Sequence, residues 1–150
     1  MGEKMIPQSE LFNSPVEVGT RVALLLTLIP GVELNLDEIA FFDYALIFSK
    51  EFDGGENIHP ALPNHFSEII KRRETLPTTL KFFISKGIIT SSIGSDGIKY
   101  RATDEAIHYV SALKSSYYKK LIKNLTWVER NLGRLREEQQ KMFRMRVLGR

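Results

Sequence analysis

The sequence predicts an α+β, mainly α-helical fold with a winged helix-turn-helix core and a C-terminal helical extension. A run of apolar residues at helical spacing ends at Lys86-Gly87, where glycine favours the left-handed backbone that terminates helices. Two short β-rich runs, residues 88–93 and 98–101, then flank an Asp-Gly turn, which is a strong hairpin signal. A new helix opens at Thr103. The order helix, hairpin, helix is typical of the end of a winged helix.

We expect the 150 residues to form three parts: a flexible leader (1–10), a winged-helix domain (11–113) and a basic helical extension (114–150). The sequence contains no cysteine, which excludes disulfides and thiolate metal sites and favours a reducing compartment. It shows no signal peptide and no apolar run of the about 20 residues that a membrane-spanning helix needs. We therefore expect a cytoplasmic protein that does not bind to a membrane.

Two helices open the winged-helix domain. Asn13-Ser14-Pro15 predicts the start of the first, because a capping side chain precedes proline at the first helical position, and Pro30-Gly31 ends this helix. The second helix begins after Asn35. Its body, residues 39–48, is apolar almost all round, which predicts burial on most sides.

The third helix is predicted to begin near Asn64. We expect it to break or kink near Leu76, because the following residue, Pro77, lacks the N–H that continues a helix. Beyond the hairpin, apolar residues at helical spacing predict a further helix over 103–113.

The C-terminal part is strongly basic. Residues 114–150 carry eleven Lys/Arg against three Asp/Glu, whereas residues 1–113 carry ten against fifteen. Apolar spacing predicts helices over 116–132 and 135–148. The apolar stripe of the last helix is sparse, so we expect it to become ordered by docking on a partner. The expected docking residues are Leu135, Met142, Phe143 and Leu148.

Several cations are candidates for contact with nucleic acid or with an acidic protein surface. They are Lys71, Arg72, Arg73, Lys99, Arg101, Lys119, Lys120 and Lys123. The first three lie where a DNA-reading helix would meet phosphates, and the next two lie on the wing. Glu68 and Glu74 flank the triplet, so contact with a protein explains this surface at least as well as contact with DNA.

Residues suited to catalysis are scarce. The three histidines, His59, His65 and His108, lack the short spacing of a zinc site. Gly54-Gly55 is not followed by the Lys-Ser/Thr of a phosphate-binding loop. No acid pair or activated nucleophile is recognisable from spacing. We therefore predict no enzyme activity, no cofactor and no metal.

Asp43 stands out because it lies within the apolar second helix. A buried carboxylate is costly unless it is paired, and Arg21 in the first helix, or Arg72 or Arg73 in the third, could supply the partner. We expect a buried structural ion pair between Asp43 and Arg21. An exposed Asp43 would instead make residues 42–44 a contact surface.

A set of short segments resembles the small middle component of bacterial ABC three-component systems, including the small subunit of Lamassu-type anti-phage defence systems. The segments are Leu11-Phe12-Asn13-Ser14-Pro15-Val16-Glu17-Val18-Gly19, Phe42-Asp43-Tyr44, His59-Pro60-Ala61-Leu62-Pro63, Arg73-Glu74, Ser85-Lys86-Gly87, Gly97-Ile98-Lys99-Tyr100-Arg101-Ala102-Thr103-Asp104 and Trp127-Val128-Glu129-Arg130. They span about residues 11–132.

This resemblance implies a non-catalytic adaptor. Its partners would be an SMC-like or Rad50-like ATPase and an effector, often a nuclease, with double-stranded DNA reached through the complex. The alternative that the residues leave open is a DNA-binding transcription regulator that uses the third helix and the wing.

Overall fold

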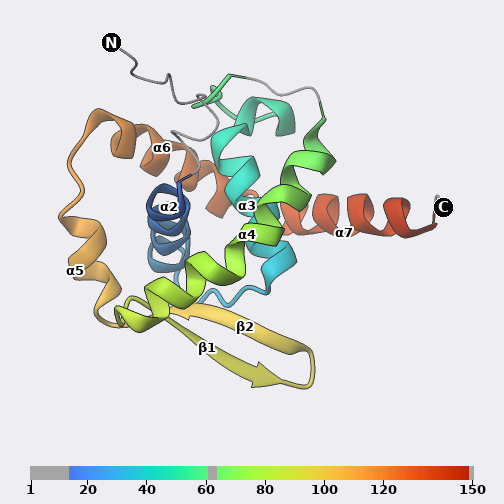
Figure 1. The fold of residues 1–150 in the computed structure, drawn as a ribbon. Coiled ribbons are helices and arrows are strands. Elements are labelled where there is room, and N and C mark those ends of the chain that lie inside the picture. The colour runs from blue at the N-terminus through green and yellow to red at the C-terminus, as the bar shows by residue number, and fades with distance from the viewer. Residues whose placement is uncertain (1–13, 61–63, 149–150) are drawn as a thin grey trace, which may run out of the picture.

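Helix α3 (Leu36–Ile47) lies at the centre of the protein, as a computed structural model shows for residues 14–60 and 64–148 (Figure 1). Each residue from Ile39 to Phe48 exposes 1% of its surface or less. The apolar character of this helix on nearly all sides explains why it is surrounded, and the predicted burial is confirmed. The predicted leader, residues 1–10, lies outside the described residues.

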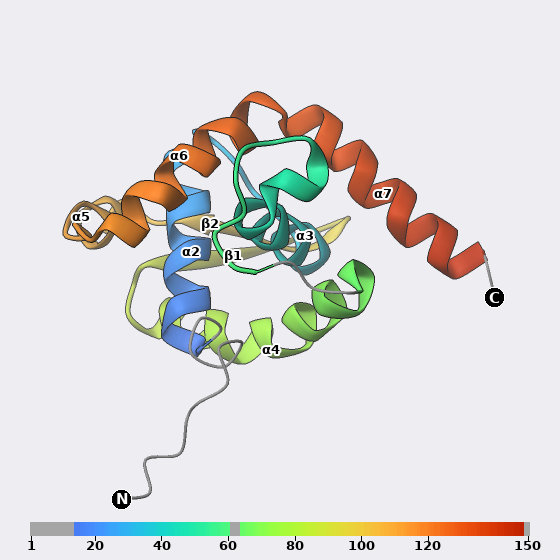
Figure 2. The same ribbon diagram turned by 90° about the horizontal axis from the view of Figure 1, so that it is seen from above.

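Four helices pack around α3. They are α2 (Pro15–Leu28), α4 (His65–Ser85), α6 (Ser116–Arg130) and α7 (Leu132–Leu148). Figure 2 shows α3 between α4 on one side and the arch of α6 and α7 on the other. The far end of α7 extends away from the body of the protein (Figure 1).

Local capping fixes where the first helices begin. The Ser14 hydroxyl accepts a hydrogen bond from the Glu17 backbone N–H at 3.3 Å, and Pro15 follows at the first helical position. The Asn35 side chain accepts from the Glu38 N–H at 2.8 Å, while the Glu38 carboxylate accepts from the Asn35 N–H at 3.1 Å. These caps satisfy N–H groups that have no partner inside a helix, so both predicted starts are confirmed.

Helix α4 is continuous through Pro77, so of the break or kink predicted near Leu76, the break is wrong. Leu76 is fully buried, and other apolar residues on both sides of the proline also pack in the core. This packing outweighs the loss of one backbone hydrogen bond. Side chains bind neighbouring carbonyl groups: Thr75 Oγ1 donates to Arg72 O at 3.1 Å and Thr79 Oγ1 donates to Thr75 O at 3.4 Å. Figure 2 shows that the helix curves along its length.

An antiparallel hairpin follows α4. Gly87, at φ 75°, ends the helix in the left-handed region, as predicted. Strand β1 (Ile89–Gly94) then pairs with β2 (Gly97–Ala102) through a two-residue turn, with Gly97 at φ 96°. Both glycines occupy backbone conformations that side chains disfavour, which is why the sequence signals the hairpin clearly.

The linker before α3 adds a third segment to this hairpin. Leu34 N–H donates to Tyr100 O at 3.0 Å, and Tyr100 N–H donates to Leu34 O at 2.8 Å. Leu34 is fully buried. The pairing ties the outer edge of β2 to the base of α3, and the sequence analysis did not anticipate it.

Two short helices complete the connections. A 3₁₀ turn, η1 (Ser49–Phe52), follows α3, and α5 (Ala106–Ser111) follows the hairpin. Helix α5 is shorter than the predicted 103–113. Thr103 N–H donates to Ile88 O at 3.0 Å, which extends the hairpin ladder and delays the start of the helix.

The basic extension packs on the same core. Leu121, Leu125 and Val128 of α6 are buried, and Leu135 of α7 is fully buried beside them. The outward side chains of α6 are exposed, namely Lys119, Lys120, Lys123 and Arg130. This helix therefore has a buried apolar face and an exposed basic face. Within residues 14–60 and 64–148, no helix has the length and apolar character that crossing a bilayer requires.

Candidate functional site

Three helices contribute to a buried ionic cluster at the centre of the protein. Arg21 of α2 donates from Nε to Asp43 Oδ1 at 2.7 Å and from Nη2 to Asp43 Oδ2 at 3.0 Å. Arg72 of α4 places its Nε 3.4 Å from Asp43 Oδ2. The exposed fractions of Arg21, Asp43 and Arg72 are 0%, 1% and 5%. The structure thus contains the expected pair between Asp43 and Arg21, and Arg72 joins it.

The charges of this cluster support one another. Burial alone would raise the pKa of the Asp43 carboxyl, but the Arg21 and Arg72 guanidinium groups hold that pKa below its usual range. Burial favours the neutral form of Arg21, but the attraction and hydrogen bonds of the Asp43 carboxylate outweigh this effect. The pKa of Arg21 is therefore raised. Burial lowers the pKa of Arg72. One ionised carboxylate therefore joins α2, α3 and α4 through charge-assisted contacts.

A buried histidine lies beside this cluster. His59 exposes 7% of its surface, and its ring stacks on that of Tyr117 with 6.2 Å between centroids. Burial, and then the positive charge of Arg21, lower the pKa of His59 to about 4, so the ring is neutral at pH 7. His65 lies apart and contacts Tyr44. In the part of the chain that the structure describes, no group of three His, Asp or Glu side chains could hold a metal ion.

The triplet Lys71-Arg72-Arg73 does not present three free cations. Arg72 was expected at a contact surface, and this is wrong, because its position on α4 turns it toward the core and Asp43. Arg73 is exposed to 45% and pairs with Asp37 through its Nε. Lys71 is largely exposed, 3.5 Å from a carboxylate oxygen of Glu68. Neighbouring residues of a helix point in different directions, so a run of cations does not form one surface.

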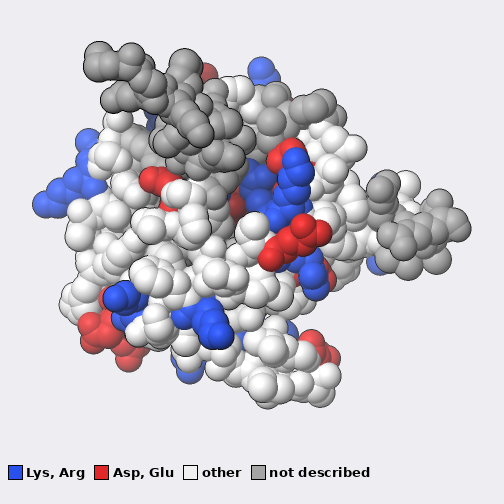
Figure 3. Space-filling model, in the orientation of Figure 1, with Lys and Arg blue, Asp and Glu red and all other residues white. Residues whose placement is uncertain are grey.

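The other candidate cations lie on two separate elements. On β2, Lys99 is half-buried and Arg101 is exposed, with its Nε 3.9 Å from Glu33 Oε1. Lys119, Lys120 and Lys123 are exposed on α6. Figure 1 places the hairpin and α6 on opposite sides of the core. On the face drawn in Figure 3, Lys and Arg form small groups separated by uncharged surface, with Asp and Glu beside several of them.

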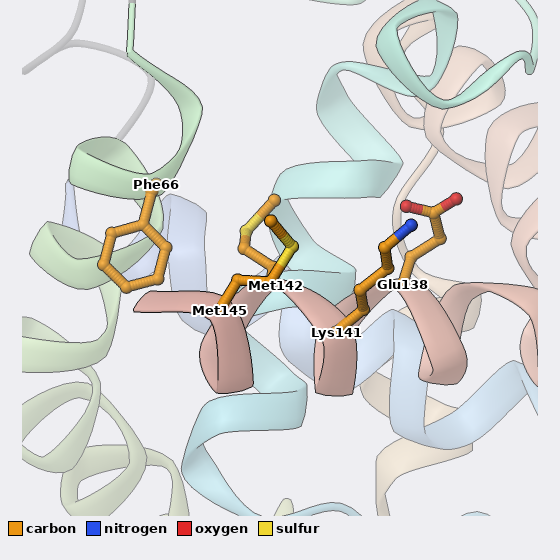
Figure 4. A pocket seen from close by; sticks show the side chains of 5 residues that line it. All are labelled: Phe66, Glu138, Lys141, Met142 and Met145. Atoms are coloured by element: carbon orange, nitrogen blue, oxygen red, sulfur yellow. The ribbon is translucent and has the colours of Figure 1, made fainter. Parts of the chain in front are cut away.

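A groove of about 420 Å³ opens between the first turn of α4 and the second half of α7, and we call it the α4–α7 groove (Figure 4). Its lining residues are Phe66 from α4 and Glu138, Lys141, Met142 and Met145 from α7. Met145 exposes 63% of its surface. Flexible thioether side chains adapt to the shape of a partner, and exposed apolar patches mark sites where proteins meet.

The predicted docking residues of α7 occupy different environments. Leu135 is fully buried in the core of its own chain, so the docking prediction is wrong at this position. Helix α7 packs on α3, contrary to the expectation that another chain would be needed. Met142 is half-buried and lines the groove, and the half-buried ring of Phe143 lies 5.4 Å from that of Phe66. The side chain of Leu148 lies outside the described residues.

Sequence reasoning did not identify Phe66 as a site residue, and it counted Met145 among the apolar residues of the last helix without selecting it as a docking residue. Phe66 lies in the first turn of α4, and nothing in the local sequence marks it as a residue of a groove. Met145 lies three residues after Met142, on one helical face, and this spacing was an available signal. The contact of Phe66 and Met145 with the same groove could not be predicted from the sequence, because 79 residues separate them.

An open groove lined by two methionines and a phenylalanine can receive an apolar side chain of a partner protein. A family model described as ABC-three component (ABC-3C) system Middle Component 2 matches residues 11–149. The chain therefore belongs to this family, and as one component of a multi-component system it has protein partners. Neither the curated proteins nor the solved structures include a significant match.

Proposed function

We propose that this chain is a non-catalytic adaptor that bridges an SMC-like or Rad50-like ATPase and an effector, a nuclease, in an anti-phage defence complex. Membership of the middle-component family supports the role of a subunit among others. The short segments described above support a relation to the small subunit of Lamassu-type systems. In this proposal the ATP-binding and effector chemistry belongs to the other chains, and this chain supplies surfaces.

We also propose that the core is a winged helix. The order α2, paired Leu34, α3, α4 and hairpin is the order of elements in that architecture. In a DNA-binding winged helix, the third of these helices would carry the base-reading side chains. Helix α4 occupies that position here.

The observation that carries the adaptor proposal is that Arg72 and Arg73 of α4 are already paired within the protein, although Lys71 and Lys81 of this helix are exposed. Arg72 is committed to the buried Asp43, and Arg73 pairs with Asp37. Reading DNA requires free cations and donors on the helix that enters the groove of the duplex. The same helix instead contributes Phe66 to the α4–α7 groove, which suits an apolar side chain of a protein.

The groove supplies a direct test. Met145→Asp places a charge in the groove at an exposed position, so the fold is retained while apolar docking is lost. Gln140→Asp is the matched control, because Gln140 is exposed on the same helix and does not line the groove. Each variant is co-expressed with the other components of its system, and the assembled complex is quantified by size-exclusion chromatography.

The adaptor proposal expects the wild type and Gln140→Asp to assemble with the ATPase and the effector, and Met145→Asp to assemble poorly. If both variants assemble equally well, the groove is not part of the interface. A wild-type chain that stays monomeric in the presence of both partners would contradict the adaptor role itself.

DNA-binding regulation is a second candidate, favoured by the exposed lysines of α6, a helix with no acidic residue before Glu129. Titration of the isolated chain with duplex DNA at two salt concentrations separates the proposals, because contacts to phosphates weaken steeply with salt. Sequence-specific binding by the isolated chain would favour the regulator.

A further inference from the structure

One edge of the hairpin has no partner. The sheet contains only β1 and β2 among the described residues, and the outer edge of β2 is occupied where Tyr100 pairs with Leu34. No residue in the described ranges pairs with the outer edge of β1. We call the outward side of Thr90–Gly94 the β1 edge.

The register shows which backbone groups point outward at the β1 edge. Thr103 N–H donates to Ile88 O, so this opposite pair is hydrogen-bonded. Hydrogen-bonded pairs alternate with non-hydrogen-bonded pairs along an antiparallel ladder. Thr90 and Ser92 therefore bond to β2, whereas the N–H and C=O groups of Ser91 and Ile93 point away from it.

A second contact gives the same assignment. Tyr100 lies opposite Ser91 and uses both its N–H and its C=O for Leu34, at 2.8 Å and 3.0 Å. These groups of Tyr100 cannot also bond to Ser91. The outward direction of the Ser91 backbone groups therefore rests on two independent hydrogen-bonding observations.

The β1 edge lacks the features by which proteins protect such edges. It contains no charged residue and no proline, and its residues are exposed from Ser91 onward. Ile93 exposes 84% of its surface, and its cross-strand neighbour Ile98 exposes 48%. Isoleucine and threonine also favour extended structure. An exposed, uncharged edge of this kind is a template for strand pairing.

We propose that the β1 edge receives an extended segment from another component of the same system, which adds a third strand to the hairpin. This inference rests on the proposed adaptor function. Only an extended backbone presents donors and acceptors at the two-residue spacing of Ser91 and Ile93. The segment is uncharged where it passes the edge, and it places an apolar side chain beside Ile93 and Ile98, whose exposed surface needs an apolar cover.

Amide hydrogen exchange, read residue by residue, tests this directly. It compares the isolated chain with the chain assembled with the other components. The amides of Ser91 and Ile93 are expected to exchange rapidly in the isolated chain and at least about tenfold more slowly in the complex. The amides of Thr90 and Ser92 are internal controls, because they already bond to β2 and stay protected in both states.

A matched pair of variants tests the contribution to binding. Ser91→Pro removes one outward N–H and no hydrogen bond to β2, whereas Ser91→Ala keeps the N–H. We expect Ser91→Pro to weaken assembly by about tenfold or more relative to Ser91→Ala. Thermal melts of the two isolated variants show whether the hairpin tolerates the proline. Should Ser91→Pro fail to fold, the exchange of the wild-type amides decides the matter.

Each outcome has a distinct meaning. If the complex assembles while Ser91 and Ile93 keep exchanging rapidly, the strand-addition proposal is wrong and the adaptor function stands. If the isolated chain dimerises and protects the same amides, the occupant is a second copy, and the proposal of another component is overturned. If no variant and no wild type assembles, both proposals fail.

Discussion

The carboxylate of Asp43 and the guanidinium of Arg21 meet through two parallel hydrogen bonds in the centre of the protein, 22 residues apart in sequence. This fork-to-fork arrangement fixes the angle between the two side chains as well as their distance. Arg72 approaches the same carboxylate from α4. The relative placement of three helices therefore depends on one acidic residue.

Replacing this residue is expected to be costly. Asp43→Asn leaves the buried Arg21 guanidinium without its counter-charge and leaves Arg72 with only the more distant Glu68 carboxylate, 3.9 Å away. We expect the free energy of unfolding to fall by about 3–5 kcal/mol. Urea denaturation measures the change. Asp37→Asn is the control, because Asp37 pairs with Arg73 at the surface, where a pair contributes about 1 kcal/mol or less. Equal losses in the two variants would contradict a special role of the buried cluster.

Stability is expected to depend on pH through His59. The pKa of this histidine is about 6.5 in an unfolded chain and about 4 in the folded protein. Between these values the unfolded chain binds a proton that the folded chain does not, so stability falls as the pH falls from about 6.5 to about 4. Melting temperatures across this range check the prediction. His59→Gln should flatten the dependence, and a wild type with a constant melting temperature would disprove it.

At lower pH, Asp43 adds to this loss. Its pKa is depressed in the folded protein, so its stabilising contribution is present above the ordinary carboxyl pKa of about 3.9 and is lost as the pH falls below that value.

The close approach of α2 and α4 at Gly19 gives a third prediction. A Cβ atom at this position would lie 2.1 Å from a ring carbon of Phe83, which is buried. Gly19→Ala should therefore destabilise the protein by about 1–3 kcal/mol through overpacking. Gly133→Ala is the matched control, because nothing lies within 4 Å of the added atom. Chemical denaturation should show no loss of stability in this control, and a similar loss in both would refute the steric argument.

The beginning of α7 is expected to be part of the fold. Leu135→Ala removes a fully buried side chain, and we expect a loss of about 2–5 kcal/mol in unfolding free energy. Met145→Ala alters a side chain that is mostly exposed and should change stability little. We therefore also expect truncation after Leu132 to destabilise the isolated chain. A truncated chain with an unchanged melting temperature would instead make α7 a dispensable appendage.

The elements that the sequence predicted best are those that local chemistry determines. The caps at Ser14 and Asn35 and the glycines at 87 and 97 act within a few residues of themselves, so their effect is visible in sequence. Helix α3 was recognisable because its body is apolar on nearly all sides. The burial of Arg72 was also accessible, because it falls at helical spacing between Ile69 and Leu76 on the buried face of α4.

The features that the sequence did not reveal depend on contacts between distant segments. Tertiary packing keeps α4 continuous through Pro77, although local propensity favours a break. The pairing of Leu34 with Tyr100 joins residues 66 positions apart. The α4–α7 groove exists only because two helices that are separated in the sequence by the hairpin, α5 and α6 converge. The spacing of apolar residues within one segment contains no information on contacts between distant segments.

Helix α4 begins at the α4–α7 groove and ends at the hairpin that carries the β1 edge. Its 21 residues correspond to about 30 Å at about 1.5 Å per residue. The helix therefore sets the distance between the two surfaces, and the buried ionic cluster holds it in place at Arg72. Two proteins bound at the two ends of α4 would be held at a defined distance and a defined relative rotation, without touching each other.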